Sequence, residues 1–158
     1  MSESSSTPGP VFSIVPPQNA SIDELIRWME GKRAQRPSLP LVDLIDADSL
    51  TSVTLVELAA VDLIGQRRRG HDALAEYYLK QFPRLSESES HVLDLIDAEL
   101  CVRRELKESF EENQMVDRFP ALAEAIGQLF HLDMPPAESF PIGSVDARTG
   151  TLGFQSDP

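Results

Sequence analysis

The stretch LDLIDAELCVRREL, residues 93–106, carries the clearest helical pattern of the chain. Its apolar residues recur every three or four positions, which places them on one face of a helix. Glu99 and Arg103 stand four positions apart, in the order that favours an ion pair on a helix surface. The stretch therefore predicts a long amphipathic helix. The apolar residues of its stripe are Val92, Leu93, Leu95, Ile96, Leu100 and Leu106.

Signals for helix starts and stops recur on both sides of this stretch. A Ser followed three positions later by Glu can satisfy the free backbone N–H groups of a helix start, and this capping box occurs at Ser21, Ser86 and Ser109. Pro83 and Pro120 each follow a Phe and are expected to stop a helix. These signals, together with the helical spacing of the apolar residues, predict an all-α fold.

The chain also resembles itself at an offset of 37 residues. Each of the two matching units has a long helix, a tight turn, a short helix and a Phe-Pro stop. We predict tandem helical hairpins, one over residues 49–85 and a second, with the final helix, over residues 86–131. Chance matches between amphipathic helices are the alternative. The identical pairs are Ser49 and Ser86, Leu58 and Leu95, Leu63 and Leu100, Arg67 and Arg104, Phe82 and Phe119, Pro83 and Pro120, and Leu85 and Leu122.

One helical domain over residues 21–132 accounts for most of the chain, whose 158 residues and 41% hydrophobic content suffice for one core. A first helix is predicted over residues 21–36. The segment 37–48 is either a short helix or an extended connector. Residues 1–20 and 133–158 are rich in Ser, Pro, Gly and Thr, so we expect disordered tails there.

Charge and composition argue against several classes of partner. The 26 acidic residues outnumber 14 basic ones, and a net charge of −12 repels the phosphate backbone of nucleic acid. No stretch approaches the roughly 20 apolar residues that a membrane span needs. The single cysteine, Cys101, is expected to be a buried thiol in a reducing compartment. We therefore expect a cytoplasmic protein with neither nucleic acid nor membrane as partner, and leave the oligomeric state open.

Residues typical of catalysis or metal binding are scattered. His71, His91 and His131 lie far apart, and none is spaced to share a metal with another histidine or with Cys101. Neighbouring carboxylates are common in so acidic a chain, where they usually form a solvated helix face. We predict no catalytic residue, no metal and no cofactor.

Two basic clusters are the candidate contacts for a protein partner. Each can receive an acidic peptide or a phosphorylated group through charge-assisted hydrogen bonds. The alternative is that they stabilise helix ends and pair locally with Asp62 and Glu99. The candidate residues are Arg67, Arg68, Arg103 and Arg104.

Residues 93–106, followed by Arg118-Phe119-Pro120-Ala121-Leu122, resemble the region ahead of the kinase domain in planctomycete-type bacterial serine/threonine protein kinases. The earlier unit is similar to another form of the same pattern, and the two cover roughly residues 36–130. The resemblance implies a non-catalytic part that regulates, positions or binds a partner. The residues that carry it in the earlier unit are Asp62, Arg67, Gly70, Tyr78, Phe82 and Pro83.

The motifs of the kinase domain itself are missing from the chain. Gly143, Gly150 and Gly153 do not form a glycine-rich phosphate loop, no lysine follows Lys107, and neither His-Arg-Asp nor Asp-Phe-Gly occurs. We therefore expect no kinase activity, and favour a regulatory or adaptor module that binds a kinase or another signalling protein. The alternatives are a truncated kinase remnant without independent activity, and a small-molecule sensor with a pocket between hairpins.

Overall fold

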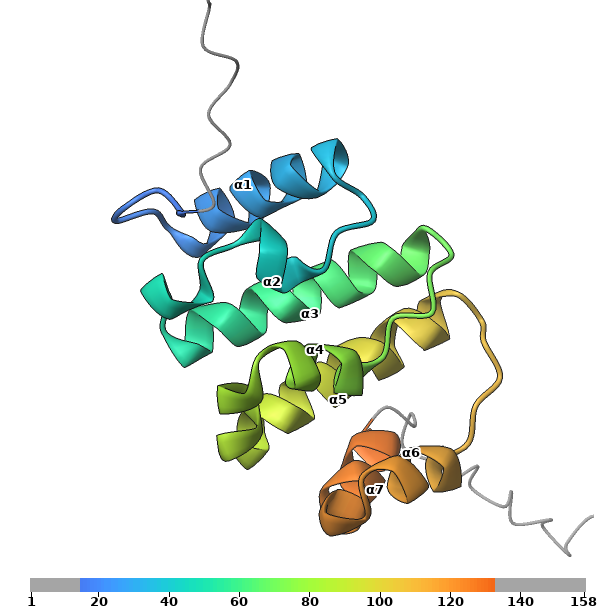
Figure 1. Ribbon diagram of the computed structural model, residues 1–158. Coiled ribbons are helices and arrows are strands. Elements are labelled where there is room, and N and C mark those ends of the chain that lie inside the picture. Colours follow the sequence, from blue (N-terminus) through green and yellow to red (C-terminus); the bar gives the residue numbers. More distant parts are fainter. Residues whose placement is uncertain (1–14, 133–158) are drawn as a thin grey trace, which may run out of the picture.

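The computed structural model describes residues 15–132 and contains only helices and their connections in that range (Figure 1). The all-α prediction is confirmed. The predicted tails fall at residues 1–14 and 133–158 outside the described residues; Val15–Ala20 is described, and Pro16 in it is buried. In chain order the elements, with 3-10 helices written η, are α1 (Ile22–Gln35), α2 (Leu41–Leu44), η1 (Ala47–Ser49), α3 (Ser52–Arg68), α4 (Ala75–Gln81), η2 (Pro83–Glu87), α5 (Glu89–Glu105), α6 (Glu112–Arg118), η3 (Pro120–Leu122) and α7 (Ala123–Leu132).

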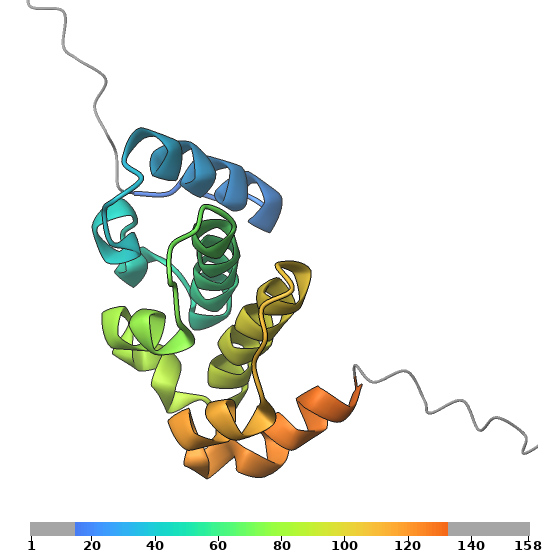
Figure 2. The same cartoon turned by 90° about the vertical axis from the view of Figure 1, so that its right-hand side faces the viewer.

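Three long helices, α1, α3 and α5, form a stack in which α3 lies between the other two. The short helices α2 and α4 form a second layer along one side of this stack (Figure 2). α4 packs against α5 and against α2, so a short helix contacts the units on both sides of its own. At the end of the stack, α6 and α7 pack on each other, and α7 also contacts α5.

The helix boundaries repeat with the offset that the sequence predicts. α3 and α5, α4 and α6, and η2 and η3 each begin 37 residues apart, and both pairs of α-helices also end 37 residues apart. Gly70 and Lys107, which follow the two long helices, also stand 37 residues apart, and both have a left-handed backbone with φ of 86° and 56°. The chain therefore turns in the same way after α3 and after α5.

The short helix α2 and the turn η1 follow the same plan one unit earlier. The predicted connector 37–48 is thus a short helix and a 3-10 turn. Leu41, Tyr78 and Met115, spaced 37 residues apart, are all buried in their short helices. In each case the backbone N–H four positions later closes the helix on their carbonyl, with N to O distances of 3.2, 2.9 and 3.0 Å. The sequence comparison missed this third, abbreviated unit because its core residues differ in type.

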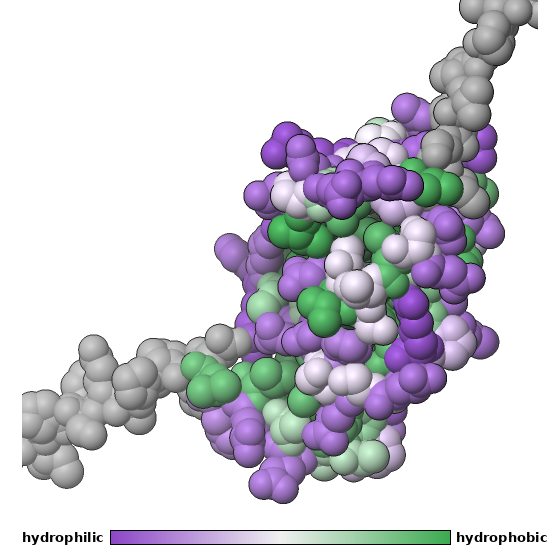
Figure 3. All heavy atoms as spheres, turned by 90° about the vertical axis from the view of Figure 1, so that its left-hand side faces the viewer, coloured by the Kyte–Doolittle hydropathy of each residue, from purple (hydrophilic) through white to green (hydrophobic). Residues whose placement is uncertain are grey.

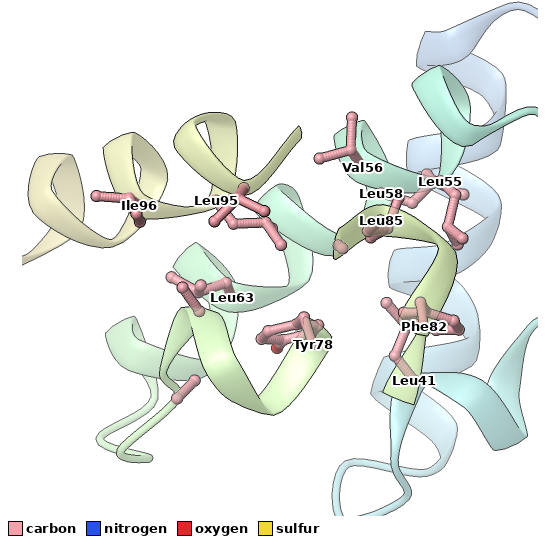
Figure 4. Close-up of a cluster of buried hydrophobic side chains, with 14 of the residues drawn as sticks. Leu41, Leu55, Val56, Leu58, Leu63, Tyr78, Phe82, Leu85, Leu95 and Ile96 are labelled. Carbon is pink, nitrogen blue, oxygen red and sulfur yellow. The ribbon is translucent and has the colours of Figure 1, made fainter. Parts of the chain in front are cut away.

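A continuous core runs through the stack. Leu58 of α3 and Leu85 of η2 are fully buried, and they meet between the long helices and the short ones (Figure 4). Burial of such side chains stabilises the fold by about 1.5–3 kcal/mol each. Other members of the core drawn in Figure 4 are Leu41, Leu55, Val56, Leu63, Tyr78, Phe82, Leu95 and Ile96.

Of the three predicted capping boxes, only the first is present. Ser21 Oγ accepts a hydrogen bond from the N–H of Glu24 at 3.3 Å, and Glu24 Oε2 accepts one from the N–H of Ser21 at 2.7 Å. Ser86 instead belongs to η2, because the Phe-Pro stop continues as a 3-10 helix and delays the start of α5. Ser109 lies before α6, whose first turn is capped by Glu111.

Candidate functional site

Asp62 of α3 is a buried carboxylate, with an exposed fraction of 2%. Arg33 of α1, itself 2% exposed, donates two hydrogen bonds to it from Nε and Nη2, both at 2.8 Å. Tyr78 of α4 donates a third from its hydroxyl at 2.9 Å. Burial and the negative charge of Asp62 raise the pKa of Tyr78 far above its usual range. Asp62 of α3 is therefore bound by side chains of α1 and α4, and its charge is balanced by that of Arg33.

Glu99 of α5 occupies the equivalent position in the next unit and is fully buried. Arg118 of α6 donates two hydrogen bonds to it, at 2.7 and 2.8 Å, and the backbone N–H of Ala75 donates another at 2.8 Å. Burial alone raises the pKa of Glu99, but these hydrogen bonds and the charges of Arg118 and Arg103 outweigh it and hold the pKa below its ordinary value. Arg118 also binds Glu76. Glu99 is thus held as an ion by its donors, which leaves it poorly placed to transfer protons.

Arg67, one of the predicted contact residues, is buried with 6% exposure. Its guanidinium donates to Asp72 at 3.0 Å, to the carbonyl of Ala73 at 2.8 Å and to Glu108 at 2.6 Å. The alternative that Arg67 pairs with Asp62 is wrong, because Arg33 and Tyr78 occupy that carboxylate. Arg67 fixes the turn after α3 and has little surface to offer a partner.

The other three predicted arginines also have contacts within the chain. Arg68 forms an exposed two-bond pair with Glu105 at 2.8 and 2.7 Å. Arg103 binds Glu99 at 3.0 Å, so the predicted local pairing of these two residues is confirmed. Arg104 lies over the ring of Phe130, 5.7 Å from its centre.

Glu108 links the two basic clusters. It binds Arg67 of the first cluster and Arg103 of the second, the latter at 3.4 Å. The ends of α3 and α5 therefore form a mixed network of arginines and carboxylates. It is not a surface of free cations. Whether these arginines contact a partner remains a prediction.

A cavity of about 290 Å3 lies between α3 and α5, and within residues 15–132 it is lined by these two helices alone. We call it the α3/α5 groove. Its apolar lining comes from Val56, Ala60, Ile64, Ala98 and Cys101. Cys101 is exposed, so the prediction of a buried thiol is wrong: the small side chains around it leave this face of α5 uncovered.

Three carboxylates, Glu57, Asp94 and Asp97, complete the lining of the α3/α5 groove. Among the described residues no Lys, Arg or His forms an ion pair with any of them. Asp97 accepts only a long contact from the Cys101 thiol, at 3.9 Å. The groove thus combines an apolar floor with acidic side chains that have no cation of their own. Sequence reasoning treated these carboxylates as an ordinary solvated face and missed the groove.

A second cavity, of about 260 Å3, lies between the segment before α2, the end of α3 and the start of α4. Tyr77 and Gln66 contribute to its wall, and Gln66 Oε1 is buried without a hydrogen-bond partner among the described residues. Its counterpart one unit later has a volume of about 230 Å3 and is lined by Arg103 and Gln114 at the equivalent positions. The two cavities therefore share a position in the repeat and differ in chemistry.

Other kinds of site receive no support from the described residues. Within residues 15–132 no group of three or more His, Cys, Asp or Glu side chains is arranged to hold a metal ion. No helix in this part of the chain has the length and apolar character to cross a bilayer. Hydrophilic side chains cover most of the face seen in Figure 3, with hydrophobic ones in scattered patches between them. Comparison of the chain with protein-family models, curated proteins and solved structures gives no match.

Proposed function

We propose that this chain is a non-catalytic regulatory or adaptor module that binds a protein partner at the α3/α5 groove. The first candidate for the partner is a bacterial serine/threonine kinase or another signalling protein, as the resemblance of residues 93–106 implies. The internal ion pairs support a role that depends on a fixed shape. They satisfy the buried charges and hold the long helices in place.

The observation that carries this proposal is the lining of the groove. Stable protein contacts combine an apolar centre with a polar edge, and parallel helices commonly receive a partner segment in the groove between them. Ala60 and Cys101 leave apolar surface open at the centre, and Glu57 and Asp94 stand beside it without internal cations.

A small-molecule sensor is the second candidate, and the cavity at Gln66 and Tyr77 supports it. The unpartnered Gln66 Oε1 would accept a hydrogen bond from a bound ligand. The volume of about 260 Å3 lies just below the roughly 300–1,000 Å3 of most ligand pockets, so we rank this function second. A thermal-shift screen of small metabolites, repeated on Gln66→Leu, tests it.

Site-specific photo-crosslinking in living cells tests the adaptor function. A benzophenone amino acid replaces Glu57 in the groove or, as the control, Lys80, which is exposed on α4 in the layer of short helices. We expect one polypeptide to be crosslinked from position 57 and not from position 80, and its sequence to contain kinase or other signalling motifs. Equal labelling from both positions, or none from position 57 in a folded chain, contradicts the proposal.

A further inference from the structure

We infer that the occupant of the α3/α5 groove is a basic amphipathic helix of the protein partner. This inference rests on the proposed function and names the chemistry of the segment that the groove receives. Three features of the groove support it: the spacing of the lining residues, the small side chains of the floor and the negative charge of the acidic side chains.

The spacing of the lining residues suits a helix. α3 and α5 run in the same direction, since residues 37 positions apart face each other along their length and Arg68 bonds Glu105 at their ends. The lining forms successive rows at Glu57 and Asp94, at Ala60 and Asp97, and at Ile64 and Cys101. Rows three and four residues apart span about 10 Å at 1.5 Å per residue. A helix with apolar residues at i, i+3 or i+4, and i+7 presents the same spacing.

The floor leaves room for side chains of that helix. Ala60, Ala98 and Cys101 all line the groove, and all three have small side chains. The resulting cavity of about 290 Å3 is open along the two helices. Large apolar side chains that project from a docked helix would cover the floor and remove its surface from water, which is the favourable term in such contacts.

Charge selects a basic occupant. The charged side chains that line the groove, Glu57, Asp94 and Asp97, are all acidic, and Arg104 adjoins it only at Cys101. The chain carries a net charge of −12, so the long-range field attracts cations as well. A second copy of the chain would bring the same carboxylates against each other. The ends of the chain, residues 1–14 and 133–158, contain a single basic residue, Arg148, and so lack the cations that a complementary segment needs.

A designed peptide pair tests the inference on the full-length chain. Both peptides have 18 residues and the same leucines at i, i+3, i+4 and i+7; one carries Lys at the remaining positions and the other carries Glu. Binding of the fluorescently labelled peptides is measured by anisotropy at moderate salt. We expect the Lys peptide to bind at least tenfold more tightly than the Glu peptide.

Two triple variants of equal net charge separate the groove from the general acidity of the protein. The groove variant is Glu57→Gln, Asp94→Asn and Asp97→Asn. The control variant is Asp43→Asn, Glu87→Gln and Glu124→Gln, three exposed acids on other elements. We expect the groove variant to weaken binding of the Lys peptide about tenfold and the control variant less than twofold. Thermal unfolding of each variant verifies that it is folded.

A steric pair completes the test. Ala60→Phe fills the floor and should abolish binding of the Lys peptide, whereas Ala34→Phe on the exposed side of α1 should leave it unchanged. Equal weakening by the two triple variants, or no binding of the Lys peptide, overturns the inference. If position 57 still crosslinks a partner in cells while the Lys peptide fails, the adaptor function stands and the basic-helix chemistry falls.

Discussion

Asp62 and Glu99 stand 37 residues apart, at the same place in two successive long helices, and each is a buried carboxylate that accepts two hydrogen bonds from one arginine. The arginines come from opposite directions. Arg33 reaches Asp62 from the preceding long helix, α1, whereas Arg118 reaches Glu99 from the following short helix, α6. The first ion pair therefore ties α1 to α3, and the second ties α6 to α5.

Removal of Arg33 should strongly destabilise the fold. Arg33→Ala leaves Asp62 charged and buried, and the loss of one partner from a buried ion pair costs about 3–5 kcal/mol. The double variant Arg33→Met, Asp62→Leu removes both charges and should regain at least half of that loss. Guanidinium unfolding measures the three free energies. If the double variant is less stable than the single one, the cost does not arise from the unpaired charge.

The network at Glu99 should make stability depend on acid pH. The folded-state pKa of Glu99 lies below its ordinary value of 4.5, so its contribution is present above that pH and is lost as the pH falls through the folded value. Glu99→Gln should be less stable than the parent near pH 7, and the difference should shrink as the pH falls below 4.5 and through the folded value. Glu124→Gln, at an exposed position, serves as the control and should show no such convergence. A constant difference across the range would exclude ionisation of Glu99 as the cause.

The turns after α3 and after α5 should both be more stable with glycine at the left-handed position. Gly70→Ala forces a side chain into a backbone with φ of 86° and should cost about 1–2 kcal/mol. A Cβ at this position meets no atom within 4 Å, so only the backbone conformation contributes. Lys107→Gly relieves the same strain at the equivalent place and should raise stability by up to about 1 kcal/mol. Matching thermal unfolding curves for both variants and the parent would show that this strain is absent.

Arg67 and Arg68 should differ sharply although they are neighbours in a basic cluster. Arg67→Ala leaves the carbonyl of Ala73 without its donor and leaves Glu108 only the longer contact with Arg103, so it should cost about 2–4 kcal/mol. Arg68→Ala breaks only an exposed pair and should have little effect on unfolding. A binding test that replaces the whole cluster could therefore lose binding because the fold is destabilised, and not because a contact with the partner is lost. Equal losses of stability in urea would contradict the burial of Arg67.

Much of the fold was predictable because its signals are local. The helical spacing of residues 93–106, the Phe-Pro stops and the 37-residue offset all act within one unit, and the helix boundaries repeat with that offset. Two of the helix starts were predicted wrongly. Ser86 lies within the 3-10 helix η2, and Glu111 rather than Ser109 caps α6. Such choices depend on how the next helix packs.

The candidate site was less predictable because it depends on contacts between units. Arg33 lies 29 residues from Asp62, and no spacing rule connects them. Arg67 looked available in the sequence and is buried, whereas Cys101 looked buried and is exposed. The α3/α5 groove exists only when side chains of two different units, such as Ala60 and Ala98, line the same cavity. A pattern read along one helix does not contain that information.

The placement of α4 against both α2 and α5 has a consequence for how such a protein can grow. In the stack each long helix packs on the next one, and α7 contacts α5 at the end of the stack. In-frame duplication of one 37-residue unit would therefore lengthen the stack and extend the existing core. Each added long helix would also create another groove beside its neighbour, so the valency of the module would rise by one with every duplication.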